Sequence, residues 1–464
     1  MHIATDMDSA PQTDLSSTDM TRRLARQALA FDDRAVPADV EEIARHCLLD
    51  WFSVSLAAWD SPQLRALQAW VGLEPAPGVA TLLGSGQRVA ASQAALINGT
   101  ASHLLDFDDA HLPSRVHPSA PLWPAILAMA QTHGGSGAQA LAAFAAGVQV
   151  QSRLGAVMGN SHYRDGWHNT ATLGTFGATA AAGRLLGLDE DALCRAFGFA
   201  ATLSAGMRSV FGSPAKPLHA GRAAATGMMA AGLVHRGMET FGDILERPEG
   251  YVQTYASTFD PARIDAPADL WEVRRIVFKY HASCYGTQAP IEAALALRGR
   301  MDRAGCERID VHVEPQYMDV CNIARPTTTS EAKFSVAHMV ALALAGRDTS
   351  NEENLSGSAL TDGDVIAWRD LIHVHGDPQV ARANARVTIA GSNGRLENTH
   401  DASLPQSDLR IQRRRLLEKS SLLLNPRYGE SRVTEAQAGL LAIGSQDALG
   451  DWLQDIVLRM VDDK

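Results

Sequence analysis

Four stretches of this sequence place ionisable or nucleophilic side chains within otherwise apolar surroundings. The first is LLDFDDAHLPSRVHPSAPLW, and the other three are YRDGWHNTATLGTFG, GSPAKPLHAGRAA and FKYHASCYGTQAP. The residues in them that could do chemistry are Asp106, Asp108, Asp109, His111 and His117 in the first; His168 in the second; Lys216, His219 and Arg222 in the third; and Lys279, His281, Ser283 and Cys284 in the fourth.

These residue types suit proton transfer on an anionic substrate. Histidine titrates near neutral pH and therefore takes up or releases a proton readily. Lys216 and Arg222 stand at the start of an expected helix, where free N–H groups also favour an anion. Together with Lys279 they would suit a substrate with more than one carboxylate. A histidine base could attack a C–H bond beside a carboxylate, because nearby cations would stabilise the carbanion that forms.

Each stretch also has a structural explanation that the sequence leaves open. Asp106 could cap a helix, with Asp108 and Asp109 in a solvated turn. His168 could be a hydrogen-bonded structural residue, and Lys216 could belong to a loop that enters a helix at Pro217. For Cys284 we favour a buried small side chain over a nucleophile, since no base stands beside it in sequence. The histidines interpreted as structural are His111, His312, His338 and His373.

Other kinds of site are not favoured. The sequence has no G-x-S-x-G, G-x-x-x-x-G-K-[ST] or H-E-x-x-H motif, and no G-x-G-x-x-G after an expected strand. The aspartates and His111 of the first stretch crowd together without a metal-ligand spacing, so we expect no metal. The five cysteines are odd in number and widely spaced, which favours a reduced, cytoplasmic protein.

Composition narrows the function classes further. With 464 residues, two domains are expected. The formal net charge of −11 gives no basic footprint for nucleic acid, and the run LRIQRRRLLEKS is interpreted as the solvated face of a helix. The N-terminus lacks the pattern of a signal peptide, and the apolar windows are too short to cross a bilayer. We therefore expect neither a nucleic-acid nor a membrane partner.

The periodicity predicts a mainly α protein with an inserted α+β domain. Helical spacing runs from Ser17 to about Asp260, with segments dominated by Ala and Gly that predict close helix packing. RIDVHVEP alternates like a strand, and ARVTIAGSNGRLE has an Asn393-Gly394 turn between strand-like runs. One helix, SEAKFSVAHMVALALAG, is expected between them. The expected division is a disordered leader over 1–16, a helical domain over 17–265, an α+β domain over 266–398, and helices over 399–464 that return to the helical domain.

Six stretches in order give the chain a resemblance to a known family. NGTASHLLDFDD, HPSAPLWPAILA, GWHNTATLGTFGATAAAGRLLG, KPLHAGRAAATG, FKYHASC and RPTTTSEAKFS resemble the MmgE/PrpD family, which includes 2-methylcitrate dehydratases, cis-aconitate decarboxylases and iminodisuccinate epimerases. The resemblance implies a homodimer in which the α+β domain acts as a lid. It also implies a pocket between the domains that takes small di- and tricarboxylates without a metal or organic cofactor.

The resemblance assigns roles to five residues. His117 or His168 would transfer the proton, Lys216 and Lys279 would hold carboxylates, and Asp106 would orient a histidine or a substrate hydroxyl. Arg222, His281, Ser283 and Cys284 are expected to contribute to substrate binding. Decarboxylase-like members have Thr where this chain has Ala110 and His where it has Cys284, and the tyrosine they carry before the R-P of the lid is matched only by the nearby Tyr317.

These departures rank the activities. Dehydration of a 2-methylcitrate-like acid is the first expectation, epimerisation of an imino- or amino-dicarboxylate the second, and cis-aconitate-type decarboxylation is less favoured. A non-catalytic carboxylate-binding protein is a further alternative.

Overall fold

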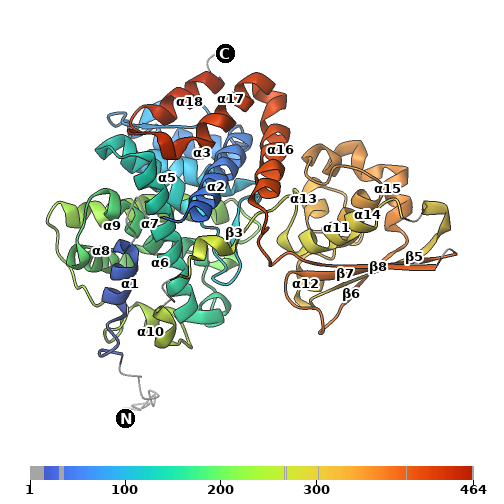
Figure 1. Cartoon of the computed structure of the whole chain (residues 1–464), viewed down its shortest axis with the longest axis horizontal. Coiled ribbons are helices and arrows are strands. Elements are labelled where there is room, and N and C mark those ends of the chain that lie inside the picture. The colour runs from blue at the N-terminus through green and yellow to red at the C-terminus, as the bar shows by residue number, and fades with distance from the viewer. Residues whose placement is uncertain are drawn as a thin grey trace, which may run out of the picture.

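The chain folds into a large helical lobe and a smaller α+β lobe, joined near a short strand, β3 (Ala110–His111) (Figure 1). The computed structural model describes residues 15–30, 36–265, 267, 269–300, 302–392 and 394–461. Most of the expected leader and Asn393 of the expected turn lie outside the described residues. Leu15, however, which was expected in the leader, is buried in the core of the helical lobe. The fold class is mainly α, as the periodicity predicted.

Helices from both ends of the sequence build the larger lobe. Residues from the C-terminal helices, such as Leu416, Leu440 and Val457, belong to the same apolar core as the N-terminal helices. None of the described helices is both long enough and apolar enough to span a bilayer. The helices are α1 (Met20–Leu29), α2 (Ala38–Ala57), α3 (Pro62–Val71), α4 (Ala91–Leu104), α5 (Ser119–His133), α6 (Gly137–Arg164), α7 (Asn169–Leu185), α8 (Glu190–Leu203), α9 (Ala215–His235), α10 (Tyr251–Tyr255), α16 (Leu409–Tyr428), α17 (Glu430–Leu441) and α18 (Trp452–Val461).

The smaller lobe is a four-stranded sheet with helices packed on it. The strands β5 (Cys306–Val313), β6 (Ile372–Gly376), β7 (Asn384–Gly391) and β8 (Gly394–Asp401) lie in the order β6-β5-β7-β8, with only β5 and β6 parallel. Ile309, Val311 and Val313 are buried, which confirms the alternation predicted for β5. The helices are α11 (Tyr285–Leu297), α12 (Gln316–Val320), α13 (Thr329–Lys333), α14 (Val336–Leu344) and α15 (Gly363–Arg369).

Three boundaries differ from the sequence expectation. Val273, Ile276 and Phe278, which were expected in the α+β domain, pack in the helical core, where β4 (Ile276–Val277) pairs with β3 (Ala110–His111). Strand β8 continues past residue 398 to Asp401. The single helix expected over 330–346 is two helices, α13 and α14, because Ser335 between them caps the second by accepting a hydrogen bond from the His338 N–H at 3.2 Å.

Small residues allow the helices that carry the site to approach closely. A Cβ added to Gly99 of α4 would lie 2.8 Å from the Cα of Gly221 on α9, and one added to Gly221 would overlap the carbonyl oxygen of Leu96. Since real Cβ atoms do not approach so closely, this crossing requires glycine on both helices. It fixes the first turn of α9 beside the end of α4, and both segments contribute side chains to the site described below.

Replacement of Gly221 tests this close packing. We expect Gly221→Ala to lower the free energy of unfolding by about 1–3 kcal/mol, because the new methyl group forces α4 and α9 apart. Gly232→Ala on the same helix is the matched control, since nothing lies within 4 Å of a Cβ there. That variant should be neutral or slightly stabilising. Urea unfolding of both variants compares them; equal stability would contradict the packing argument.

Candidate active site

A cavity of about 190 Å³ lies where the two lobes meet. The helical lobe lines it with Asp106, His117, His168, Lys216 and Lys279, so these five predicted residues do converge on one cavity. The small lobe adds Cys284, Tyr285, Tyr317 and Arg382.

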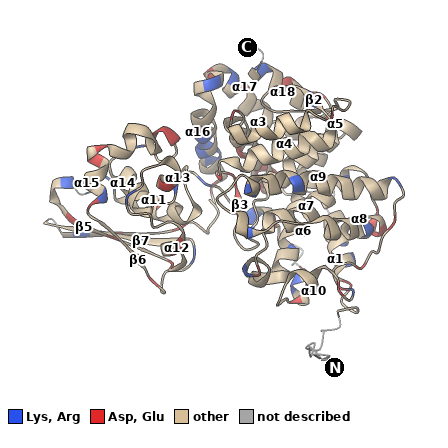
Figure 2. Cartoon of the chain, turned by 180° about the vertical axis from the view of Figure 1, so that it is seen from behind, with Lys and Arg blue, Asp and Glu red and all other residues tan. Residues whose placement is uncertain are grey.

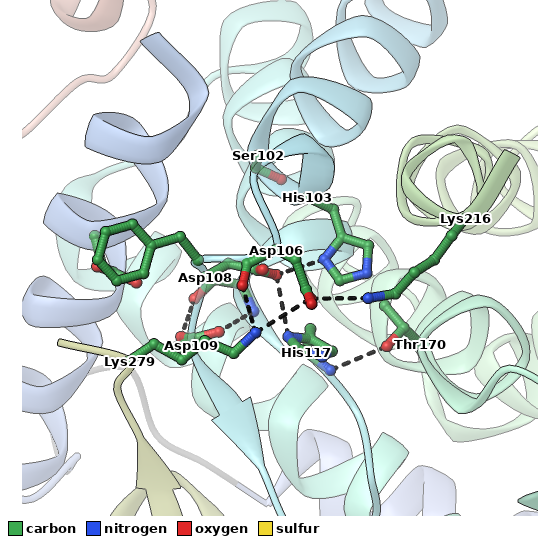
Figure 3. Close-up of polar contacts among 12 residues, drawn as sticks. Ser102, His103, Asp106, Asp108, Asp109, His117, Thr170, Lys216 and Lys279 are labelled. Atoms are coloured by element: carbon green, nitrogen blue, oxygen red, sulfur yellow. Dashed lines mark hydrogen bonds and ion pairs between the residues drawn. The ribbon is translucent and has the colours of Figure 1, made fainter. Parts of the chain in front are cut away.

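Asp106 stands between the two lysines (Figure 3). Its carboxylate lies 2.8 Å from Lys216 Nζ and 3.1 Å from Lys279 Nζ, and Lys279 also donates to its carbonyl oxygen. The backbone of Asp106 has a φ of 50°, a left-handed conformation that Asp tolerates better than most residues. Loss of hydration alone would raise the pKa of Asp106. The charges of Lys216 and Lys279 outweigh this and hold that pKa well below its usual range.

Asp108 contacts the imidazole rings of two histidines in the site. Its carboxylate accepts a hydrogen bond from His103 Nδ1 at 2.8 Å and lies 3.3 Å from His117 Nδ1. Burial lowers the pKa of His103 to about 4, so this ring is neutral at neutral pH. Burial alone would raise the pKa of Asp108, but His103 and His117 hold it well below its usual range. An ionised Asp108 therefore orients both rings, and the 18% exposed His117 is the one that opens to the cavity.

His168 forms the third part of the imidazole cluster. It precedes the first turn of α7, and its Nδ1 lies 3.0 Å from Nδ1 of His219, which is on α9. The ring centroids of His168 and His103 are 5.9 Å apart. Burial, together with the nearby Lys216 ammonium, puts the pKa of His168 well below its usual range. This imidazole is therefore neutral at neutral pH.

Asp109 is neither solvated nor part of the cavity wall. Asp108 and Asp109 are fully buried, so the alternative of a solvated turn is wrong. Asp109 accepts hydrogen bonds from the N–H of Ser119 at 3.2 Å and from its hydroxyl at 2.5 Å. Burial and the charge of nearby Asp50 raise the pKa of Asp109 to about 7. His111 is hydrogen bonded to Glu272 and Ser114, and it also lines the cavity.

Three predicted binding residues lie away from the cavity. Arg222 is exposed on α9 and is not among the cavity-lining residues. His281 is engaged by Thr349 Oγ1 at 2.7 Å and Glu292 at 3.2 Å, and Ser283 is hydrogen bonded to Thr287. The fourth, Cys284, does line the cavity, where a hydrogen bond with Cys321 lowers the pKa of its thiol.

Sequence reasoning missed several residues of the site. His103 ends a helix that reads as apolar, whereas Tyr163 and Tyr285 stand in the second and fourth of the quoted stretches and could have been found there. Arg115 stands two residues before His117 in the first stretch, so it could have been found there. Arg382 lies in a turn before β7 and has no sequence signal.

One group of the described side chains has donor atoms close enough to hold a metal ion. The atoms of His103, Asp108 and His117 that could bind a metal lie within 4.8 Å of one another. Two of these donors, His103 Nδ1 and Asp108 Oδ2, are already bonded to each other.

Two family models match most of the chain. Residues 22–264 match the MmgE/PrpD N-terminal domain, and residues 281–441 match the MmgE/PrpD C-terminal domain. The chain belongs to the MmgE/PrpD family. The resemblance seen in the sequence is therefore confirmed.

Several proteins to which the chain is similar are named cis-aconitate decarboxylases. A cis-aconitate decarboxylase of Aspergillus terreus is 29% identical over 346 residues, which cover 68% of this chain and 69% of that protein. The cis-aconitate decarboxylase of Mus musculus is 30% identical over 275 residues, 55% of each chain. The one of Homo sapiens is 30% identical over 220 residues, 46% of this chain and 45% of that protein.

The buried carboxyl of Asp109 makes the protein's stability depend on pH. A carboxyl group whose pKa rises on folding contributes stability that is fully present below its ordinary pKa and is lost as pH rises through about 7. Asp109→Asn mimics the protonated form at every pH. We expect this variant to match the wild type near pH 4 and to exceed its stability by a few kcal/mol above pH 7 (roughly 1.4 kcal/mol per pKa unit).

Thermal unfolding measured across this pH range checks the expectation. Asp447→Asn, at an exposed position, is the control and should follow the wild type at all pH values. A constant difference between Asp109→Asn and the wild type would show that the carboxyl group is not the titrating cause.

Proposed function

We propose that the protein is a cofactor-independent lyase that dehydrates a small hydroxylated di- or tricarboxylate, such as a 2-methylcitrate-like acid. The observation that carries this proposal is the position of His117 and His168 beside the ammonium groups of Lys216 and Lys279 on one small cavity. The imidazoles supply proton transfer, and the lysines supply positive charge where a carbanion beside a carboxylate would develop.

His117 is the proposed base. Its Nδ1 faces the ionised Asp108, which leaves Nε2 for the substrate, and its side chain opens to the cavity. Asp108 would stabilise the imidazolium that forms when His117 takes the proton. The C–H electron pair then becomes the new C=C bond, the C–O bond breaks, and hydroxide leaves as water with the proton from His117. Lys216 and Lys279 hold the carboxylate next to the reacting carbon throughout.

Decarboxylation is the second candidate, favoured by the names of the similar proteins. It would use the same cations, but the broken bond would be C–C and the product CO2. Ala110 and Cys284, which replace the Thr and His of decarboxylase-like members, rank it below dehydration. Epimerisation would share the proton abstraction but release nothing, so the products distinguish the three reactions.

Product analysis tests the proposal. Purified protein is incubated with 2-methylcitrate, citrate, cis-aconitate and iminodisuccinate while alkene absorbance, CO2 release and deuterium uptake are followed. We expect alkene from a hydroxylated acid without CO2. Release of CO2 from cis-aconitate would establish decarboxylation instead, and deuterium uptake without alkene would establish epimerisation.

Replacement of His117 tests its role in whichever reaction is found. We expect His117→Gln to lower kcat by about 100- to 10,000-fold while the fold and stability are kept, because proton transfer by a positioned base contributes that much. His133→Gln, at an exposed position on α5, is the control and should keep full activity. A fully active His117→Gln would exclude this residue as the base.

Metal removal separates acid–base chemistry from metal chemistry at the same residues. His103, Asp108 and His117 could also bind a metal, so the two kinds of chemistry need separating. Because the proposed mechanism uses no metal, we expect dialysis against EDTA to leave kcat unchanged. The measurement is turnover and bound metal content before and after dialysis. A loss of activity restored by Zn²⁺ or Mn²⁺ would overturn the cofactor-independent mechanism.

A further inference from the structure

A second group of cations lines the cavity in addition to the two lysines. Arg115 comes from the loop between β3 and α5, and Arg382 comes from the turn before β7 in the small lobe. Lys216 and Lys279 share Asp106 as their counter-ion. Within the described parts of the chain, no carboxylate oxygen lies within 4.0 Å of the guanidinium of Arg115 or of Arg382.

Aromatic rings, and not acids, surround these arginines. The guanidinium of Arg115 lies 4.6 Å from the ring centroid of Tyr163, and that of Arg208 lies 3.7 Å from the same centroid. Tyr317 lies near Arg382 on the cavity wall, where the charge of Arg382 opposes the rise that burial causes in the pKa of the Tyr317 phenol. Such stacking fixes the planar guanidinium groups but neutralises none of their charge.

The positions of Arg115 and Arg382 are electrostatically unfavourable unless an anion binds between them. Burial and the charge of Arg382 lower the pKa of Arg115, which shows that the two like charges oppose each other. The backbone of Arg115 also has a φ of 54°, a left-handed conformation that a residue of this size rarely adopts. The charge repulsion and the left-handed backbone are both unfavourable, and both occur beside the proposed site. A carboxylate bound there would offset the charge repulsion by accepting bidentate hydrogen bonds.

We infer that Arg115 and Arg382 form a carboxylate subsite that holds the end of the substrate distant from Lys216 and Lys279. The inference rests on the proposed function and narrows its substrate to acids with a second carboxylate within reach of the arginines. Because one arginine belongs to each lobe, the distal carboxylate also bridges the lobes. Binding would therefore favour the arrangement in which the small lobe covers the cavity.

Binding of an unreactive acid tests the subsite without the need for turnover. Tricarballylate has three carboxylates but no hydroxyl group to eliminate, and butyrate has a single carboxylate. We expect Arg382→Gln to weaken tricarballylate binding by about 10-fold or more in calorimetry, because a charge-assisted hydrogen bond is lost. Butyrate binding should change by less than about twofold, since the lysines alone hold it.

A neighbouring arginine gives the matched control. Arg386 lies on β7 near Arg382 but pairs with Asp377 at 2.9 Å and does not line the cavity. Arg386→Gln should leave tricarballylate binding unchanged. Equal losses in the two variants, or no loss in Arg382→Gln, would overturn the subsite. Because Arg382 is exposed in a turn, its replacement leaves the core intact.

A double-mutant cycle tests whether both arginines hold one carboxylate. Arg115→Gln and Arg382→Gln should each weaken tricarballylate binding, and the double variant should lose less than the sum, since both remove the same interaction. Additive losses would overturn the shared subsite. Thermal unfolding without ligand identifies any loss of fold in Arg115→Gln, and the Arg382 variant then carries the test alone.

The outcomes separate this inference from the proposed function. If tricarballylate binds in an Arg382-dependent way but no acid is turned over, the subsite stands and the lyase proposal fails. If a monocarboxylate is dehydrated as efficiently as a tricarboxylate, the lyase proposal stands and the subsite is overturned.

Discussion

The contact of Asp106 with Lys216 and Lys279 makes this cavity possible. Two ammonium groups drawn to one point repel each other by about 4 kcal/mol at 4 Å in a protein of effective dielectric near 20. One carboxylate between them turns that repulsion into two ion pairs. It also ties together three segments that are distant in sequence: the loop after α4, the start of α9 and the segment after β4. The charge left over is a single positive one, which suits a substrate carboxylate.

A second buried pair supports this arrangement from the C-terminal side. Lys419 of α16 donates to Asp50 at 2.6 Å, to the carbonyl of Phe107 at 2.6 Å and to the carbonyl of Lys279 at 3.0 Å. A buried ion pair contributes little net stability, but it specifies one geometry when all its hydrogen bonds are made. Here the bonds hold α16 against both the Asp106 loop and the Lys279 segment. The returning helix therefore positions the site as well as completing the core.

The sequence predicts which residues could do chemistry, but it does not predict which distant segments the fold brings together. The motif residues of the site were found because ionisable groups stand out in apolar segments. The basic run on α16 is largely solvated, as expected, and Figure 2 shows its Lys and Arg positions along that helix; yet Lys419 near its end is buried. Arg222 could have been excluded, because six residues at about 100° each place it away from Lys216 on α9. Arg382 could not have been found, since only the fold of the small lobe brings its turn to the cavity.

The crowding of imidazoles determines which of them can accept a proton. The rings of His103, His117 and His168 lie close together, and the charge of Lys216 opposes the addition of a proton to His103 and to His168. Among the residues that the structure describes, no carboxylate forms an ion pair with His168, and the pKa of His168 is well below its usual range. His103 does contact Asp108, but its complete burial outweighs that contact and lowers its pKa to about 4. His117 alone combines the Asp108 contact with an opening to the cavity, because it is the ring at the edge of the cluster. Burial, and not residue type, thus divides three equivalent side chains into one group suited to proton transfer and two that stay neutral.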